Sequence, residues 1–204
     1  MITIENLNKT FAGSVVLNDI STEFENGKTN LIIGQSGSGK TVLLKCILGL
    51  FGIDSGEIFF DKKSFQKMTV KQRSIIRQEI GMVFQGSALF DSMTVEENIM
   101  FPMQMLTQKG FEEMKVRANQ VIERVNLVNA NKKLPSELSG GMQKRVAIAR
   151  AIVMNPKYLF CDEPNSGLDP KTSTIIDNLI QEITEEYEIT TIINTHDMNS
   201  VMEI

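Results

Sequence analysis

The sequence has 204 residues, a length that suits one domain or one core with an insertion. Hydrophobic residues account for 42% and charged residues for 23%, as in an ordinary soluble globular protein. The formal net charge of −4 argues against the broad basic surface of a nucleic-acid-binding protein, so we expect no nucleic acid among the partners.

Short strands are predicted at the start of the chain. Residues 2–7 alternate apolar and polar side chains with period two, which predicts an edge strand with one solvated face. Residues 15–17 and 20–24 are typical of further strands, and residues 26–27, Asn-Gly, are typical of a turn. Residues 31–33 form a short apolar run that predicts a buried strand.

A glycine-rich segment, residues 34–41, leads from this strand into a predicted helix that begins at Val42. It fits the pattern G-x-x-x-x-G-K-[ST], the phosphate-binding loop of P-loop NTPases. Its glycines let backbone N–H groups wrap around an anion, and the helix dipole favours negative charge there. We expect Lys40 to reach the β- and γ-phosphates and the Thr41 hydroxyl to ligate Mg²⁺. The expected nucleotide contacts of this segment are Gly34, Gln35, Ser36, Gly37, Ser38, Gly39, Lys40, Thr41 and Val42.

Strands and helices continue to alternate after the first helix. The chain breaks at residues 54–56, and residues 57–60 then predict a short strand. Residues 69–78 predict a helix, and residues 80–84 predict a strand that ends next to Gln85.

The pattern becomes helical between residues 94 and 128, where only Pro102 and Gly110 interrupt it. Thr94 and Glu97 have the S/T-x-x-E spacing of a capping box, which predicts the start of a helix. No convincing strand is predicted in this stretch. A helical insertion is therefore expected here.

The last third of the chain returns to alternation. Ser139 is a good N-cap for a helix predicted over residues 142–154. Residues 158–161 predict a strand, residues 169–187 a helix and residues 190–195 a final strand. Strands on both sides of a helical stretch predict an α/β core that a helical insertion interrupts.

The strand at residues 158–161 ends in two acids, Asp162 and Glu163. A carboxylate at the end of a strand beside the phosphate loop can hold the Mg²⁺ shell, and we assign this role to Asp162. Glu163 is expected on the opposite side of the strand, where it can orient the attacking water or accept its proton. Taken alone, the pair also fits an acidic turn that closes a strand, but the phosphate loop favours the functional interpretation.

A family resemblance rests on several further motifs. Residues 138–145, Leu-Ser-Gly-Gly-Met-Gln-Lys-Arg, resemble the signature motif of ABC (ATP-binding cassette) ATPases, and they precede the Asp-Glu strand as in that family. Gln85 resembles the Q-loop glutamine, residues 166–169 resemble the D-loop, and His196 resembles the switch histidine. Phe11 has the position of the aromatic residue that stacks on adenine. The resemblance covers essentially the whole chain.

The resemblance implies roles for three of these side chains. His196 is expected to bond the γ-phosphate and the attacking water; a lone histidine is more often structural, but this one follows a core strand where α/β ligands gather. Gln85 is expected to ligate Mg²⁺ and water and to act as a hinge, unless it is only a polar strand end. Phe11 is expected to stack on adenine or else to fill core space.

We thus expect ATP and Mg²⁺ as cofactors, with Lys40, Gln85, Glu163 and His196 as catalytic residues and Thr41, Gln85 and Asp162 as metal ligands.

The signature motif implies a partner. Ser139, Gly140 and Gly141 open a helix, and by resemblance they hold the γ-phosphate of ATP bound to a second copy, so that two ATP molecules lie in a head-to-tail dimer. Asp169 of the D-loop is placed among the nucleotide contacts. Met142 replaces the commoner glutamine of the signature, and a thioether is too weak an acceptor to replace a polar contact from that position. We still expect hydrolysis.

The branch of the family is predicted from two segments. Residues 135–142 and the segment 85–95 resemble the ATPases of Mla/Mce-type phospholipid transporters. In that family the segment faces membrane-spanning permease subunits, and its apolar residues 88–90 are expected either to fill a groove there or to anchor a buried loop. Residues 145–151 are shared with amino-acid and methionine importers and do not discriminate. The favoured function is an energy-coupling ATPase for phospholipid transport; the alternatives are an amino-acid or methionine importer and a non-transport ABC ATPase.

No segment predicts secretion or a membrane span. Cys46 and Cys161 lie in apolar segments without metal-ligand spacing, which favours a reduced intracellular protein with two core thiols. The start of the chain lacks the features of a signal peptide. The longest apolar stretch, residues 42–53, contains Lys45 and is too short to span a bilayer. A peripheral position at the cytoplasmic face of the bacterial inner membrane, through a partner, is therefore expected.

The expected architecture is an α/β P-loop NTPase core, with a RecA-like parallel sheet and an antiparallel β-subdomain, and an inserted ABC helical subdomain. We assign residues 1–85 and 156–204 to the nucleotide-binding core and residues 86–155 to the helical insertion, all within one ABC ATPase domain, 1–204. The chain stops eight positions after His196, whereas family members continue, so we expect a C-terminal truncation.

Overall fold

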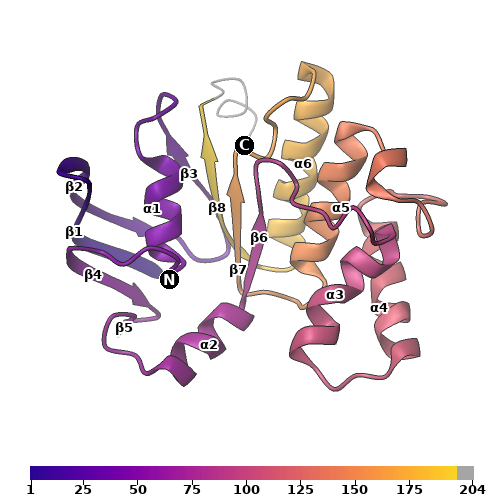
Figure 1. Cartoon of the computed structure of the whole chain (residues 1–204), viewed down its shortest axis with the longest axis horizontal. Coiled ribbons are helices and arrows are strands. Elements are labelled where there is room, and N and C mark those ends of the chain that lie inside the picture. The colour runs from indigo at the N-terminus through magenta and orange to yellow at the C-terminus, as the bar shows by residue number, and fades with distance from the viewer. Residues whose placement is uncertain (197–204) are drawn as a thin grey trace.

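Two four-stranded sheets and the helices around them form the protein in a computed structural model that describes residues 1–196 (Figure 1). One sheet is antiparallel and the other is parallel. The strands of the antiparallel sheet, in spatial order, are β2 (Ser14–Phe24), β1 (Ile2–Phe11), β4 (Ser55–Phe60) and β5 (Lys63–Ser64). Those of the parallel sheet are β3 (Thr29–Ile33), β8 (Thr190–Thr195), β7 (Tyr158–Asp162) and β6 (Ile80–Val83). The predicted combination of a parallel core and an antiparallel subdomain is confirmed.

The expected edge position of residues 2–7 is wrong. β1 lies between β2 and β4, with Ile4 paired to Thr22 on one side and to Ile58 on the other. A period of two reports one buried face, and a central antiparallel strand has such a face just as an edge strand does. The two strands predicted at residues 15–17 and 20–24 form a single strand, β2, which runs through Asp19 at φ 52° and an irregular register.

The parallel sheet determines where the functional residues gather. β7 and β8 are buried along their entire lengths, and Asp162 pairs with Asn194 at their ends. β3 pairs with β8 on the other side, with Ile33 opposite Thr195. Because parallel strands end at the same edge of a sheet, the segments that follow β3, β6, β7 and β8 all begin at one edge.

One core lies between the sheets and contains the first helix, α1 (Lys40–Ile47), which lies in front of the strands in Figure 1. Leu44 and Ile47 of α1 are buried in the same cluster as Ile4 of β1 and Phe160 of β7. Both predicted core thiols are buried, and burial raises the pKa of Cys46 and of Cys161.

Helices fill the chain between β6 and β7. They are α3 (Val95–Leu106), α4 (Phe111–Arg124), a short 3-10 helix (Pro135–Glu137) and α5 (Gly140–Ile152). The predicted helical stretch 94–128 is thus two helices, separated before Gly110, which is the N-cap of α4, while Pro102 lies inside α3. Thr94 and Glu97 form the predicted capping box.

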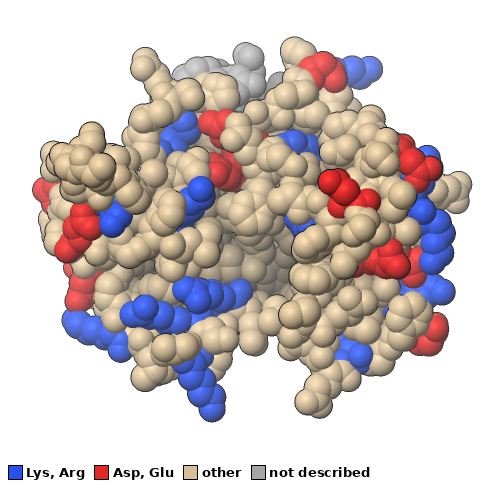
Figure 2. Space-filling view, in the orientation of Figure 1, with Lys and Arg blue, Asp and Glu red and all other residues tan. Residues whose placement is uncertain are grey.

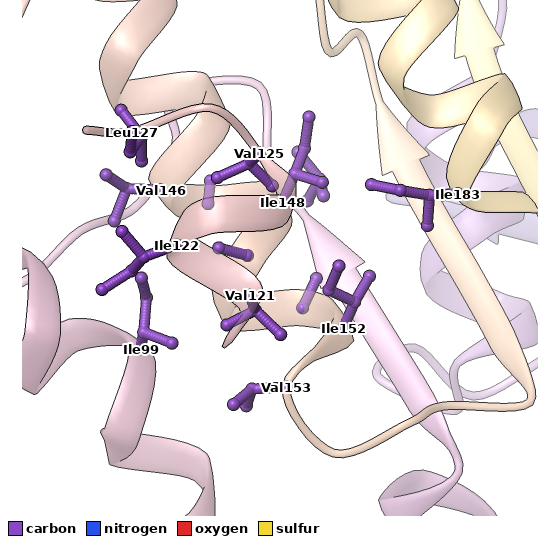
Figure 3. Close-up of a cluster of buried hydrophobic side chains, with 14 of the residues drawn as sticks. Ile99, Val121, Ile122, Val125, Leu127, Val146, Ile148, Ile152, Val153 and Ile183 are labelled. Carbon is purple, nitrogen blue, oxygen red and sulfur yellow. The ribbon is translucent and has the colours of Figure 1, made fainter. Parts of the chain in front are cut away.

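The side chains of α5 connect these helices to the sheet. Ile148 and Ile152 of α5 face Val121 of α4 and Ile183 of α6 (Pro170–Glu186), all in one buried cluster (Figure 3). The same cluster contains Leu159 of β7. The helical part therefore packs on the parallel sheet through α5 and α6, and its position relative to the sheet depends on them.

The remaining helix, α2 (Val70–Gln78), has no buried residue, and Thr69 caps it through a capping box with Gln72. Charged side chains of both signs are interspersed on the face in Figure 2, and basic side chains gather over the lower left part, where Figure 1 places α2. No helix among the described residues is long and apolar enough to cross a bilayer. The boundaries 1–85, 86–155 and 156–204 remain our proposal, and residues 197–204, where the truncation was expected, lie outside the described residues.

Candidate nucleotide-binding site

The phosphate loop joins the end of β3 to the start of α1, as predicted. Gly37 and Gly39 have φ values of 80° and 95°, which favour glycine. A Cβ on Gly39 would also lie 3.1 Å from the carbonyl oxygen of Val16, so β2 passes too close for a side chain. The loop therefore ends at the N-terminus of α1, where the first backbone N–H groups lack helical partners and favour an anion.

Lys40 lies folded across this loop and is only 8% exposed. Its Nζ donates to the carbonyl oxygens of Gly34 at 2.7 Å and Gln35 at 3.0 Å. The ammonium group is thereby held at the mouth of the loop, where it can contact a phosphate by a small rotation of the side chain.

Thr41 and Asp162 meet at the base of the loop. Thr41 Oγ1 donates to Asp162 Oδ1 at 2.9 Å, and Asn194 Nδ2 donates to the same oxygen at 3.1 Å. Asn194 Oδ1 is buried without a hydrogen-bond partner. Sequence reasoning missed Asn194, because its pairing with Asp162 across two parallel strands appears only in the folded structure.

The oxygen atoms of Thr41 and Asp162 fit Mg²⁺, which prefers hard oxygen ligands. No group of three or more His, Cys, Asp or Glu residues suited to a metal ion exists among residues 1–196. A metal here would therefore rely on phosphate oxygens and water for its remaining ligands, as Mg²⁺ commonly does in nucleotide sites.

Glu163 brings three of the other predicted residues together. His196 Nδ1 lies 3.1 Å and Lys40 Nζ 3.7 Å from Glu163 Oε1, while Gln85 Nε2 donates to Glu163 Oε2 at 3.0 Å. Gln85 also donates to Ser166 Oγ at 3.2 Å. Four residues that sequence reasoning named as catalytic therefore form one hydrogen-bonded and charged group.

A cavity of about 360 Å³ opens beside this group. Glu163 and His196 form one part of its wall, and Ser166, Leu168 and Ser173 form another. The carboxylate of Glu163 is thus partly accessible, with 15% of its side chain exposed, and a water molecule can reach it. The site can hold an anion, a cation and a water molecule close together.

The signature residues Ser139, Gly140 and Gly141 lie at the N-terminus of α5 and not at the phosphate loop of their own chain. Ser139 is exposed and caps α5, accepting a hydrogen bond from Met142 N at 3.3 Å. A Cβ on Gly141 would lie 2.7 Å from Thr172 Cγ2 of α6, so α5 begins in close contact with α6. Within the described residues, neither Ser139 nor Gly140 has a hydrogen bond to the phosphate loop.

Asp169 and Phe11 have structural contacts of their own. Asp169 is the N-cap of α6; the Thr172 hydroxyl, at 2.5 Å, and the Thr172 backbone N–H, at 3.1 Å, donate to its carboxylate and lower its pKa. The Phe11 ring packs edge-on against Phe51, with centroids 5.3 Å apart, and is 39% exposed. It is therefore not a buried core residue, and one part of its ring is free to contact a ligand.

The segment after Gln85 lines a groove of about 270 Å³. Ala88 and Phe90 of this segment line it together with Phe84, which precedes Gln85. The other lining residues include Phe101 of α3, Arg77 of α2 and Met154 after α5. Figure 2 shows a recess near the centre of the face, between the regions that Figure 1 labels α2 and α3. Phe90 packs on Phe101 with centroids 4.6 Å apart and is still 40% exposed.

Comparisons with known proteins find similar sequences over the whole chain. Residues 17–166 match the family described as ABC transporter. A methionine import ATP-binding protein of Carboxydothermus hydrogenoformans is 42% identical over 100% of the chain, and one of Clostridium tetani is 40% identical over 100% of the chain. The chain spans 61% and 64% of these relatives, so it covers less than two thirds of their length.

Solved structures match the fold. The dimeric structure of a bacterial ABC transporter cassette has a TM-score of 0.89 and 32% sequence identity, and the match covers 100% of this chain and 91% of that one. A dimeric post-hydrolysis structure of the same cassette, bound to ADP and Pi, has a TM-score of 0.88 and 32% identity over 98% and 90% of the two chains. The predicted fold class is confirmed.

Proposed function

We propose, from the premise that this chain belongs to the ABC transporter family, that it is an ATP-hydrolysing subunit that supplies energy to a transporter. The family match covers residues 17–166, and one similar cassette has been solved as a dimer in two structures, the second bound to ADP and Pi. The observation that carries the proposal is the convergence of Lys40, Gln85 and His196 on Glu163.

ATP is proposed to bind with its phosphates at the N-terminus of α1. Lys40, released from the carbonyl oxygens of Gly34 and Gln35, would contact the β- and γ-phosphates. The exposed part of the Phe11 ring would stack on adenine. Support comes from the positive-φ glycines of the loop, the helix N-terminus and the partial exposure of Phe11.

Mg²⁺ is proposed to lie between Thr41, Asp162 and Gln85. When bound, it would neutralise charge that develops on the phosphoryl oxygens. Thr41 Oγ1 and Asp162 Oδ1 already lie 2.9 Å apart, and Asn194 Nδ2 donates to the same carboxylate oxygen at 3.1 Å.

Glu163 is proposed to orient a water molecule and accept its proton, and His196 to bond the γ-phosphate. Gln85, which bonds Glu163 in this state, would turn toward the metal and the water. A positioned base contributes typically about 10²–10⁴-fold to a rate. The measurement that tests this role is ATP hydrolysis in the presence of Mg²⁺ by the parental chain and by Glu163→Gln.

A second copy of the chain is proposed to complete each site with Ser139, Gly140 and Gly141. Ser139 and Gly140 are exposed at the start of α5, and among residues 1–196 they have no hydrogen bond to the phosphate loop of their own chain. Asp169 lies at the start of α6, beside the same surface, and its nucleotide role also depends on the second copy.

A membrane-spanning permease is proposed to contact the segment 85–95. This segment lines the groove between α2, α3 and β6, and exposed Phe90 offers apolar surface to a partner. The chain would then act peripherally, at the cytoplasmic face of the bacterial inner membrane.

Methionine or a related amino acid is the cargo that we now propose. The two relatives described above are methionine import proteins, and the comparisons favour this alternative over the phospholipid transport that the segments 85–95 and 135–142 suggested. The test is to purify the full-length protein from detergent-solubilised membranes with its permease and to measure ATP-dependent uptake of methionine and of phospholipid. Uptake of phospholipid alone would reject the methionine proposal. Recovery without any membrane protein would favour a non-transport ATPase.

A further inference from the structure

Two basic side chains of α5 hold the main chain that follows Gln85. Lys144 Nζ donates to the carbonyl oxygen of Gln85. Arg150 donates from one guanidinium nitrogen to the carbonyl oxygen of Ser87 and from the other to that of Ala88, both at 2.8 Å. Three backbone carbonyls within four residues are therefore held by one helix.

The held segment has a backbone that needs external support. Ser87 and Ala88 have φ values of 61° and 47°, in the left-handed region that side chains disfavour. Ser87 is also buried. Such a conformation persists only where surrounding contacts determine it, and the guanidinium of Arg150 provides two of those contacts.

Lys144 is a buried cation and Arg150 is a half-buried one, and their hydrogen-bond acceptors are backbone carbonyls. Lys144 is 5% exposed, and within residues 1–196 no carboxylate forms an ion pair with Lys144 or Arg150. A neutral apolar side chain of similar length would avoid the cost of burying the charge, but it could not donate to these three carbonyl oxygens.

Lys144 bonds the end of this segment that carries Gln85, the residue whose side chain contacts Glu163. The carbonyl of Gln85 is bonded by Lys144, while its side chain donates to Glu163 Oε2 at 3.0 Å and to Ser166 Oγ at 3.2 Å. Because this carbonyl is hydrogen-bonded, the peptide plane between Gln85 and Gly86 is held in one orientation. The position from which the Gln85 side chain leaves the backbone is then also fixed. α5 begins at Ser139, so the same helix has its N-terminal end at the signature residues.

We propose that Lys144 and Arg150 are positioning residues that clamp the segment 85–88 to α5 and thereby fix the Gln85 side chain beside Glu163. This inference rests on the proposed function, because it assigns a role within ATP hydrolysis. The clamp makes the start of the segment move with the signature helix. Neither Lys144 nor Arg150 is among the residues proposed to bind the nucleotide.

The test uses Lys144→Met, which keeps the length of the side chain and removes its charge and N–H donors. Lys144→Arg is the rescue variant, and Lys71→Met, on exposed α2, is the matched control. With Mg²⁺ and ATP, we expect the kcat of Lys144→Met to fall about tenfold to a hundredfold, because small misplacements of catalytic groups have effects of this size. KM for ATP should stay within about twofold, since the phosphate loop is untouched. Lys144→Arg should recover most of the rate, and Lys71→Met should match the parental chain.

A second readout does not depend on catalysis. Amide hydrogen exchange of the peptide 84–92 reports on the segment, where Ser87 N–H donates to Phe84 at 2.9 Å. Exchange should rise about tenfold in Lys144→Met and in Arg150→Met, because local opening becomes less costly. If Lys144→Met fails to fold, the kinetics of ATP hydrolysis and the amide hydrogen exchange are measured on Arg150→Met and Lys144→Gln instead.

The outcomes separate the clamp from the proposed function. A parental chain that does not hydrolyse ATP, with increased exchange in the variants, would reject the function and support the clamp. Parental hydrolysis with unchanged exchange and unchanged kcat in Lys144→Met would overturn the clamp. Increased exchange with unchanged kcat, or a raised KM at normal kcat, would overturn the positioning role, because the contact would then be structural or would affect binding.

Discussion

Thr41 Oγ1 lies 2.9 Å from Asp162 Oδ1, although 121 residues separate Thr41 and Asp162 in the chain. The contact forms because β3 and β7 are both neighbours of β8 in the parallel sheet and end at the same edge. The helix that follows β3 then begins beside the acid that ends β7. A hydroxyl and a carboxylate at hydrogen-bond distance beside a phosphate loop are suited to share a divalent cation.

Glu163→Gln is expected to separate ATP binding from ATP hydrolysis. The amide retains the size of the side chain and its contact with Gln85, but it cannot accept a proton from water. We expect kcat to fall at least about a hundredfold, with KM for ATP within a few-fold of the parental value. Phosphate release under saturating ATP and Mg²⁺ measures this, and hydrolysis at the parental rate would exclude Glu163 as the base.

Lys40→Ala is expected to lose affinity for the nucleotide itself. The Lys40 ammonium is held within the phosphate loop by two carbonyl oxygens, and no other described cation lies inside that loop. Titration of the chain with a fluorescent ATP analogue gives the dissociation constant, which should rise about tenfold or more, the loss of a charge-assisted hydrogen bond. Lys71→Ala on exposed α2 should bind like the parental chain. Equal affinities of Lys40→Ala and the parental chain would contradict the assignment.

Gly141→Ala is expected to disturb the contact between α5 and α6. The added Cβ would lie 2.7 Å from Thr172 Cγ2, and Thr172 cannot rotate away without losing its 2.5 Å hydrogen bond to Asp169. We expect the free energy of unfolding to fall by about 1–3 kcal/mol, as for other overpacked sites, measured by urea denaturation.

A second substitution and a neighbouring glycine serve as controls for this contact. Thr172→Ser removes Cγ2 but keeps the hydroxyl, so the double variant should regain most of the lost stability. Gly140→Ala, whose Cβ would lie 3.4 Å from Leu168 Cδ2, should be nearly neutral. Equal destabilisation by Gly140→Ala and Gly141→Ala would show that the close contact with Thr172 is not the cause.

Glu97→Gln is expected to remove a pH-dependent part of the stability. The backbone N–H of Thr94 and then its hydroxyl donate to the Glu97 carboxylate at 2.7 and 2.8 Å, which holds the pKa of Glu97 below its ordinary value of 4.5. A lowered folded-state pKa stabilises the protein fully above 4.5, and this stabilisation disappears as the pH falls through the lower value.

The measurement is urea unfolding of the parental chain and of Glu97→Gln at several pH values. At pH 7 the parental chain should be more stable by about 0.3–1 kcal/mol, the usual effect of a negative charge at a helix N-terminus. The difference should shrink steadily below pH 4.5. A difference that grows on acidification would contradict the assigned direction of the pKa shift.

Local patterns were sufficient for most elements and for the motif residues. The phosphate loop, the capping box at Thr94 and the helix N-cap at Ser139 are short-range signals, and each of these three formed where its pattern indicated. The position of β1 in its sheet was predicted wrongly because alternation identifies a buried face but not the number of neighbouring strands.

Contacts between segments that are distant in the chain could not be predicted from the sequence patterns. Asn194 could be found only through its pairing with Asp162 across two parallel strands. Lys144 is one of several polar residues in α5 and carried no sequence signal of its own, because its contact depends on how α5 packs beside the segment after β6. Both residues act through the tertiary arrangement, which periodicity along one element does not report.

The central claim is that two copies of the chain enclose ATP, each completing the other's site through Ser139 and Gly141. Sedimentation equilibrium of Glu163→Gln with and without ATP and Mg²⁺ tests it most directly, because this variant should bind ATP without consuming it. We expect the mass of two chains with ATP and of one chain without it, and introduction of Ser139→Arg should restore the single-chain mass. A single-chain mass at saturating ATP and Mg²⁺ would contradict the claim.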